Sequence, residues 1–184
     1  MLYYQFPLRD IALVIGVLYI LGHLPGVLAP ARFMALVRRF PRNYPLGVLL
    51  TLVAGLWFMR VTQMADLGEL TLYKDRFLLA WGAGTLLQIL FMPAFIAVRG
   101  LAWIMLLAVN VILDGAFVLD TNARLVMTCL AYAWAIIAMV LVASPHLLRD
   151  AIDYVGQSDA RCRAFCIPGV LFGVLLIVLA LTCY

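Results

Sequence analysis

The sequence predicts an all-α integral membrane protein: a bundle of about six transmembrane helices with one short interfacial amphipathic helix. Two observations carry this prediction. The 184 residues are 67% hydrophobic and 12% charged, whereas soluble domains carry about 25% charged residues. The apolar residues also form runs close to the ~20 residues that a helix needs to cross a bilayer, without the two-residue alternation of a membrane β-strand. These runs use most of the chain, so we expect a single transmembrane domain over residues 1–184.

Six apolar runs are expected to cross the membrane. The first, residues 11–28, follows Arg9 and precedes small residues, a pattern that resembles a secretory signal peptide. It is long enough to span, so we expect a retained helix. The other runs cover residues 46–62, 77–98, 101–119, 125–143 and 167–183. We expect a tight turn at Arg99-Gly100 between the third and fourth runs, and a polar loop over residues 149–163.

Residues 31–40 are too short to span and predict a helix that lies in the plane of the lipid head groups. Their large apolar residues recur at the spacing of one helical face: Phe33, Leu36, Val37 and Phe40. Basic residues on and after this segment are expected to contact lipid head groups: Arg32, Arg38, Arg39 and Arg42.

Six crossings would place both termini on the same side of the membrane. Most of the 13 Lys and Arg residues fall on the opposite side. Because basic residues collect on the cytoplasmic side, we expect a multi-pass protein of the plasma (inner) membrane with both termini outside. The net charge of +4 suits contact with the lipid bilayer, and no motif for nucleic acid accompanies it, so no nucleic-acid partner is expected.

Asp114 is an ionisable residue within an apolar run, where a charge costs about 2.5–3.5 kcal/mol on insertion scales. At 1.5 Å per residue, Asp114 and Arg60 both lie about 22 Å from the cytoplasmic ends of their helices. We therefore predict a buried ion pair that locks the two helices together. In the alternative, Arg60 extends to the head groups and Asp114 bonds a hydroxyl or stays protonated.

Gln88 and Asn110 fall near the middle of adjacent predicted helices. An amide hydrogen bond between them would hold the helices together, by roughly 0.6–2 kcal/mol. The alternative is that both side chains line a polar pore.

Two further sets of residues could bind a cofactor or a metal. His23 and His146 lie toward the cytoplasmic ends of two helices, so axial ligation of haem b is an alternative; no cofactor is otherwise predicted. Cys162 and Cys166 are four residues apart and could join His146 at a zinc ion. Their spacing is not that of a zinc ribbon, so we expect reduced thiols and no metal site.

We expect no enzyme, because the sequence has no Ser-His-Asp arrangement, no HExxH motif and no phosphate-binding glycine loop. The first function is a non-catalytic membrane subunit or scaffold of a larger assembly, whose partners are other membrane subunits or copies of itself. The second is a small transporter or channel with a polar path near Arg60, Gln88, Asn110 and Asp114. The third is a redox subunit associated with haem or quinone through His23 and His146.

Overall fold

The computed structural model describes residue 4 and residues 6–184, and all the secondary structure in this part of the chain is helical. It comprises eight α-helices and two short 3-10 helices, which confirms the predicted all-α class. The elements are, in order, α1 (Leu8–Leu28), α2 (Pro30–Val37), η1 (Phe40–Arg42), α3 (Tyr44–Met64), η2 (Gly68–Tyr73), α4 (Lys74–Phe91), α5 (Ile96–Val118), α6 (Arg124–Ala143), α7 (His146–Val155) and α8 (Asp159–Thr182).

Among the described residues, five helices are long and apolar enough to cross a membrane: α1, α3, α5, α6 and α8. They contain 20 to 24 residues, or about 30–36 Å of helix, which matches the ~30 Å hydrocarbon core. α4 differs because its 18 residues begin with Lys74, Asp75 and Arg76. Its apolar part covers residues 77–91, about 22 Å. The protein is therefore a multi-pass helical membrane protein with five candidate spans, where the sequence predicted six.

The turn that precedes α5 lies at residues 92–95, so the predicted turn at Arg99-Gly100 is wrong. Pro93 disfavours a helical conformation in the residue before it. Phe95, the residue just before α5, has a left-handed backbone (φ 56°), so the chain changes direction there. Arg99 and Gly100 lie within α5. Gly100 serves close packing instead, because a Cβ atom there would lie 2.9 Å from the Leu50 Cβ of α3.

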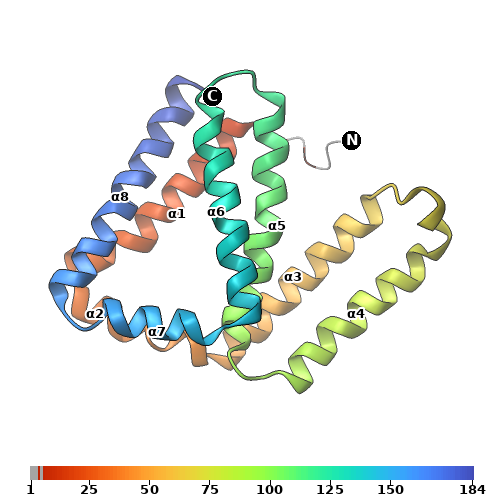
Figure 1. The fold of residues 1–184 in the computed structure, drawn as a ribbon, viewed down its shortest axis with the longest axis horizontal. Coiled ribbons are helices and arrows are strands. Elements are labelled where there is room, and N and C mark those ends of the chain that lie inside the picture. The colour runs from red at the N-terminus through yellow and green to blue at the C-terminus, as the bar shows by residue number, and fades with distance from the viewer. Residues whose placement is uncertain (1–3, 5) are drawn as a thin grey trace.

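The predicted polar loop over residues 149–163 is also wrong, because most of it is helical. α7 covers the first part of this segment, and α8 begins at Asp159. The Ser158 side chain caps the start of α8 by accepting a hydrogen bond from the Arg161 amide. α7 separates apolar and charged residues onto two faces, which is typical of a helix that lies along a membrane surface. A helix does form in the segment predicted to be interfacial, over Pro30–Val37 rather than to Phe40, and its position in the head groups stays a prediction. α2 and α7 both run across the same end of the long helices (Figure 1).

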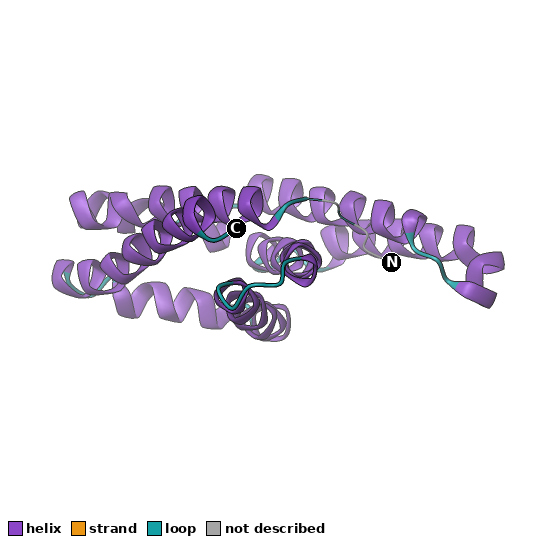
Figure 2. Cartoon of the chain, turned by 90° about the horizontal axis from the view of Figure 1, so that it is seen from above, coloured by secondary structure: helices purple, strands orange, loops and turns teal. Residues whose placement is uncertain are grey.

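The long helices pack as a row of neighbours. α1 packs along α8, α5 packs against both α6 and α3, and α4 packs mainly on α3. Seen from above, the molecule is wide and shallow (Figure 2). The largest buried cluster joins α1, α5, α6 and α8 around Ile15, Ile112, Met127 and Leu176. The α3–α4 hairpin extends away from this cluster (Figure 1).

Candidate functional site

A cavity of about 240 Å³ lies among α3, α4 and α5. Its wall is largely apolar and aromatic, with three polar side chains. The lining residues are Thr51, Ala54, Gly55 and Phe58 of α3, Trp81, Gly84, Thr85 and Gln88 of α4, and Trp103 and Leu107 of α5.

Glycines on α3 and α5 let the two helices that flank α3 approach it closely. A Cβ atom at Gly55 would lie 2.6 Å from the Thr85 hydroxyl of α4, and Gly100 brings α5 against Leu50 in the same way. The Lys74 ammonium donates to the carbonyls of Gln63 and Ala65, which fastens the start of α4 to the end of α3. α4 and α5 both pack on α3, and the cavity lies between these three helices.

Two polar atoms in the cavity wall are buried without a hydrogen-bond partner among the described residues: Thr51 Oγ1 and Gln88 Nε2. Thr51 is only 3% exposed. Other threonines behave differently, because Thr62 and Thr85 donate to the carbonyls of Phe58 and Trp81 in the preceding turn, both at 2.9 Å. A buried polar group without a partner costs about 1–3 kcal/mol. The cavity therefore offers unsatisfied hydrogen-bonding capacity within an apolar enclosure.

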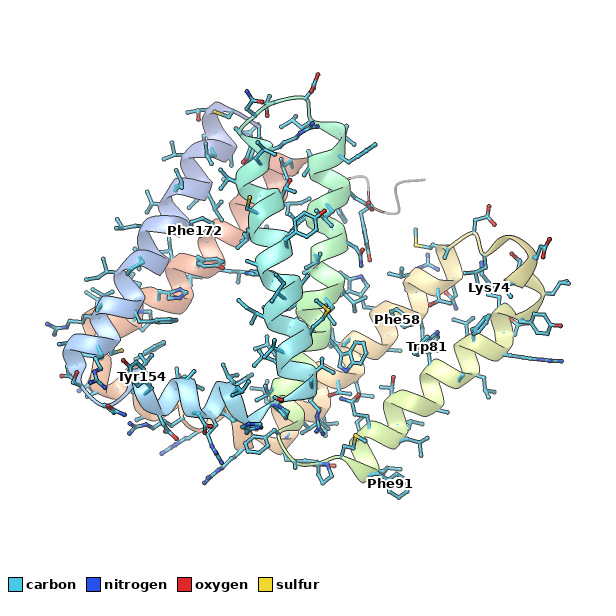
Figure 3. The ribbon with its side chains drawn as sticks, viewed as in Figure 1. Phe58, Lys74, Trp81, Phe91, Tyr154 and Phe172 are labelled. Carbon is cyan, nitrogen blue, oxygen red and sulfur yellow. The ribbon has the colours of Figure 1, made fainter. Side chains whose placement is uncertain are left out.

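Aromatic rings line the cavity from all three helices. Phe58 and Trp81 meet edge to face with ring centroids 4.6 Å apart, and Figure 3 shows them between α3 and α4. Trp103 lines the wall from α5. Trp81 and Trp103 are 43% and 37% exposed, so they lie where the cavity opens to the exterior of the molecule. Such a site suits a flat, largely apolar molecule.

The predicted ion pair between Arg60 and Asp114 is not formed. The described residues form two ion pairs within 4.0 Å, Arg38–Asp153 and Arg149–Asp150. Arg60 is exposed and donates to Gln63 in the next turn at 3.4 Å. Asp114 accepts a hydrogen bond from the Tyr4 amide at 3.2 Å. The two helices diverge at this end of the molecule (Figure 1), which explains why similar depth did not bring the side chains together.

The predicted amide bond between Gln88 and Asn110 is not formed either. The amide nitrogen of Gln88 has no partner among the described residues, and Asn110 is exposed on α5. The misplaced turn explains the error. With the break at residues 92–95, Gln88 lies about 5 Å from the end of α4, whereas Asn110 lies about 21 Å from the start of α5.

The two histidines occupy different environments. His23 Nδ1 donates to the Tyr19 carbonyl at 2.8 Å, and its ring stacks on Tyr19 and packs against the α8 backbone at Gly169. His146 is exposed at the start of α7. The structure therefore offers no support for a shared haem.

Cys162 and Cys166 are buried where α8 meets α1. The Cys162 thiol lies 3.7 Å from the Gly26 carbonyl, and the Cys166 sulfur also packs on Gly26. Among the described residues, no group of three or more His, Cys, Asp or Glu side chains is arranged to hold a metal ion. The thiols are packing residues of the α1–α8 contact.

The arginines assigned to lipid contact differ among themselves. Arg38 donates to the Gly156 carbonyl at 2.9 Å and pairs with Asp153 of α7 at 3.6 Å. It therefore links the two helices that lie across the end of the molecule. Arg32, Arg39 and Arg42 are exposed, and their contact with head groups stays a prediction.

Sequence reasoning missed Thr51, Trp81 and Trp103 as site residues. A signal for Thr51 was present, because Gly47, Thr51 and Gly55 recur every four residues and mark a close-packing face. Only tertiary packing shows that two of the four tryptophans, Trp81 and Trp103, border one cavity. No protein-family model, curated protein or solved structure matches this chain, so its function is inferred from its own residues.

Proposed function

We propose that the chain is a non-catalytic membrane subunit or scaffold, and that it binds another membrane protein or a second copy of itself through α5 and the neighbouring α3–α4 hairpin. The observation that carries the proposal is the exposure of Asn110 in the middle of a candidate span. Lipid tails cannot accept or donate hydrogen bonds, so an outward-facing amide at this depth is best satisfied by a polar group of another protein.

The position of α4 supports the same proposal. This helix packs mainly on α3 and η2, and its outer side carries exposed large residues such as Leu79, Leu90 and Phe91. Lipid would cover these side chains as well as a protein would, so they do not decide the matter alone. Its short apolar length does favour a protein neighbour, since 22 Å of apolar helix is less than the ~30 Å hydrocarbon core.

Transport has less support from the arrangement of the polar residues. Gln88 lines the cavity, Asn110 and Arg60 are exposed, and Asp114 is bonded to the segment before α1. A path for a solute would need these groups along one continuous cavity.

For orientation, we propose that α4 returns the chain across the bilayer as a sixth, shorter crossing, that the end bearing α2 and α7 faces the cytoplasm, and that both termini lie outside. Arg38 and Arg149 lie in or beside these two helices, and Arg99 lies in the first turn of α5 at the same end. Because basic residues collect on the cytoplasmic side, these arginines support a cytoplasmic position for this end.

Photo-crosslinking and native mass measurement test the subunit proposal. A photoreactive residue at position 110 should yield a protein adduct of discrete mass in the native membrane, whereas one at Leu171 of α8, which is also exposed, should yield lipid adducts. Asn110→Leu should weaken the complex about 3- to 15-fold, the equivalent of an interhelical hydrogen bond. Gln157→Leu, a similar change outside the spans, is the control.

Two outcomes would overturn the proposal. One is a single-chain particle from native membranes with lipid adducts alone at position 110. The other is Asp114-dependent movement of an ion by the purified chain in liposomes, which would favour a transporter.

A further inference from the structure

We propose that the cavity among α3, α4 and α5 binds a lipophilic molecule with a flat ring that carries a carbonyl oxygen, the chemistry of a quinone head group. The proposal concerns the isolated chain and does not depend on the subunit proposed above. It is carried by two buried donors without partners in one aromatic cavity.

The hydrogen-bonding groups select the polar part of the ligand. The Thr51 hydroxyl and the Gln88 amide nitrogen both donate, and both line the cavity without a partner among the described residues. A carbonyl oxygen accepts from such donors, and it can accept two bonds because it has two lone pairs. A lipid tail would leave both donors unsatisfied, at about 1–3 kcal/mol each.

The wall selects the apolar part of the ligand. Phe58, Trp81 and Trp103 come from three helices and present ring surfaces to the same space. Aromatic rings pair favourably with a flat ring in stacked or edge-to-face contact, by about 0.5–1.5 kcal/mol beyond the burial of apolar area. An acyl chain gains nothing from this geometry.

The size of the cavity limits the size of the ligand, and its position determines how the ligand enters. An apolar cavity of about 150 Å³ holds benzene, so about 240 Å³ accommodates one substituted ring but not a helix of another protein, whose diameter is about 10 Å. Trp81 of α4 and Trp103 of α5 both line the cavity and are partly exposed, so the cavity is not sealed from the exterior of the molecule. A ring dissolved in the bilayer can therefore enter sideways, with any tail left in lipid.

Gly84 provides a sharp test, because a side chain there projects into empty space. A Cβ atom at Gly84 would meet no other atom within 4 Å, and the residue lines the cavity. Gly84→Leu should fill the cavity without disturbing α4. Gly22→Leu on α1 is the matched control, since a Cβ atom at Gly22 also meets nothing within 4 Å and Gly22 does not line the cavity.

The experiment measures binding of menadione and decylubiquinone to the purified full-length chain in nanodiscs. Quenching of Trp81 and Trp103 fluorescence is followed in a Trp57→Phe, Trp134→Phe background, and retention of the ligand is measured in the unmodified chain. We expect saturable binding that Gly84→Leu abolishes and Gly22→Leu preserves. Thr51→Val and Gln88→Leu should each raise the dissociation constant about 2- to 12-fold, the effect of one hydrogen bond.

Several outcomes would overturn the proposal. Absence of saturable binding to a folded wild-type chain, with helicity checked by circular dichroism, would show that water alone occupies the cavity. Equal binding of a long-chain alkane and of decylubiquinone would assign the site to lipid tails. Binding that survives both Gly84→Leu and Thr51→Val would place the ligand elsewhere, and an effect of Gly84→Leu on protein complexes alone would assign the cavity to a partner side chain.

Discussion

Tyr4 and Asp114 connect the segment before α1 to α5, near the end of that helix. The Tyr4 amide donates to the Asp114 carboxylate at 3.2 Å, and the Tyr4 hydroxyl accepts from Trp57 Nε1 at 2.6 Å. One residue thereby bridges α5 and α3 at the end where these helices diverge. The partner of Asp114 is therefore the Tyr4 backbone amide, where the sequence predicted the Arg60 side chain.

We predict that Asp114→Leu frees this segment. The change leaves the Tyr4 amide without its acceptor, so its hydrogen exchange, measured by mass spectrometry in detergent micelles, should accelerate. The free energy of unfolding should fall by about 1–3 kcal/mol. Asp120→Asn, at the exposed turn between α5 and α6, should change neither quantity. Unchanged protection in Asp114→Leu would contradict the proposed role of this carboxylate.

We predict that Arg60→Gln and Asp114→Asn have independent effects. Arg60 bonds Gln63 and Asp114 bonds Tyr4, so the two side chains share no partner among the described residues. Their effects on the free energy of unfolding should add within about 0.5 kcal/mol in a double-mutant cycle. A coupling above 1 kcal/mol would restore the ion pair that the sequence suggested.

We predict opposite effects for alanine at two glycines. Gly100→Ala should destabilise the protein by about 1–3 kcal/mol, because the new methyl group would lie 2.9 Å from the Leu50 Cβ and from the Thr51 amide in a packed contact. Gly84→Ala should stabilise it by about 0.5–1 kcal/mol, because the side chain enters open space and alanine favours the helix. Thermal unfolding in detergent measures both. A stabilising Gly100→Ala would show that α3 and α5 do not approach so closely.

We predict that Asp120→Cys is labelled from outside intact cells and that Gln157→Cys is not. The first position lies in the α5–α6 turn beside the C-terminus, and the second follows α7 at the opposite end (Figure 1). A background without Cys129 and Cys183 removes labelling of the native exposed thiols. Labelling with a membrane-impermeant maleimide measures the orientation, and the reverse pattern would place both termini in the cytoplasm.

The errors in the sequence prediction have specific causes. Arg99-Gly100 has the composition of a turn, yet Gly100 is a contact point for α3, and the chain turns at Pro93 and Phe95 instead. The number of charged residues in α7 predicts a loop, whereas their spacing on one face is that of an amphipathic helix. Arg60 and Asp114 lie at similar distances along their helices, but this distance does not specify the angle between the two helices.

The sequence by itself determined the membrane class, the all-helical secondary structure and the bounds of α3 and α6 to within two residues. These features follow from local hydrophobicity and from the need to satisfy every backbone hydrogen bond within lipid. Only the tertiary structure decided that Thr51 and Gln88 border one cavity, and that Asp114 bonds Tyr4. These relationships depend on where glycines let helices touch and where the helices diverge. Such contacts join residues far apart in the chain, and nearly uniform apolar helices carry little pattern that could specify them.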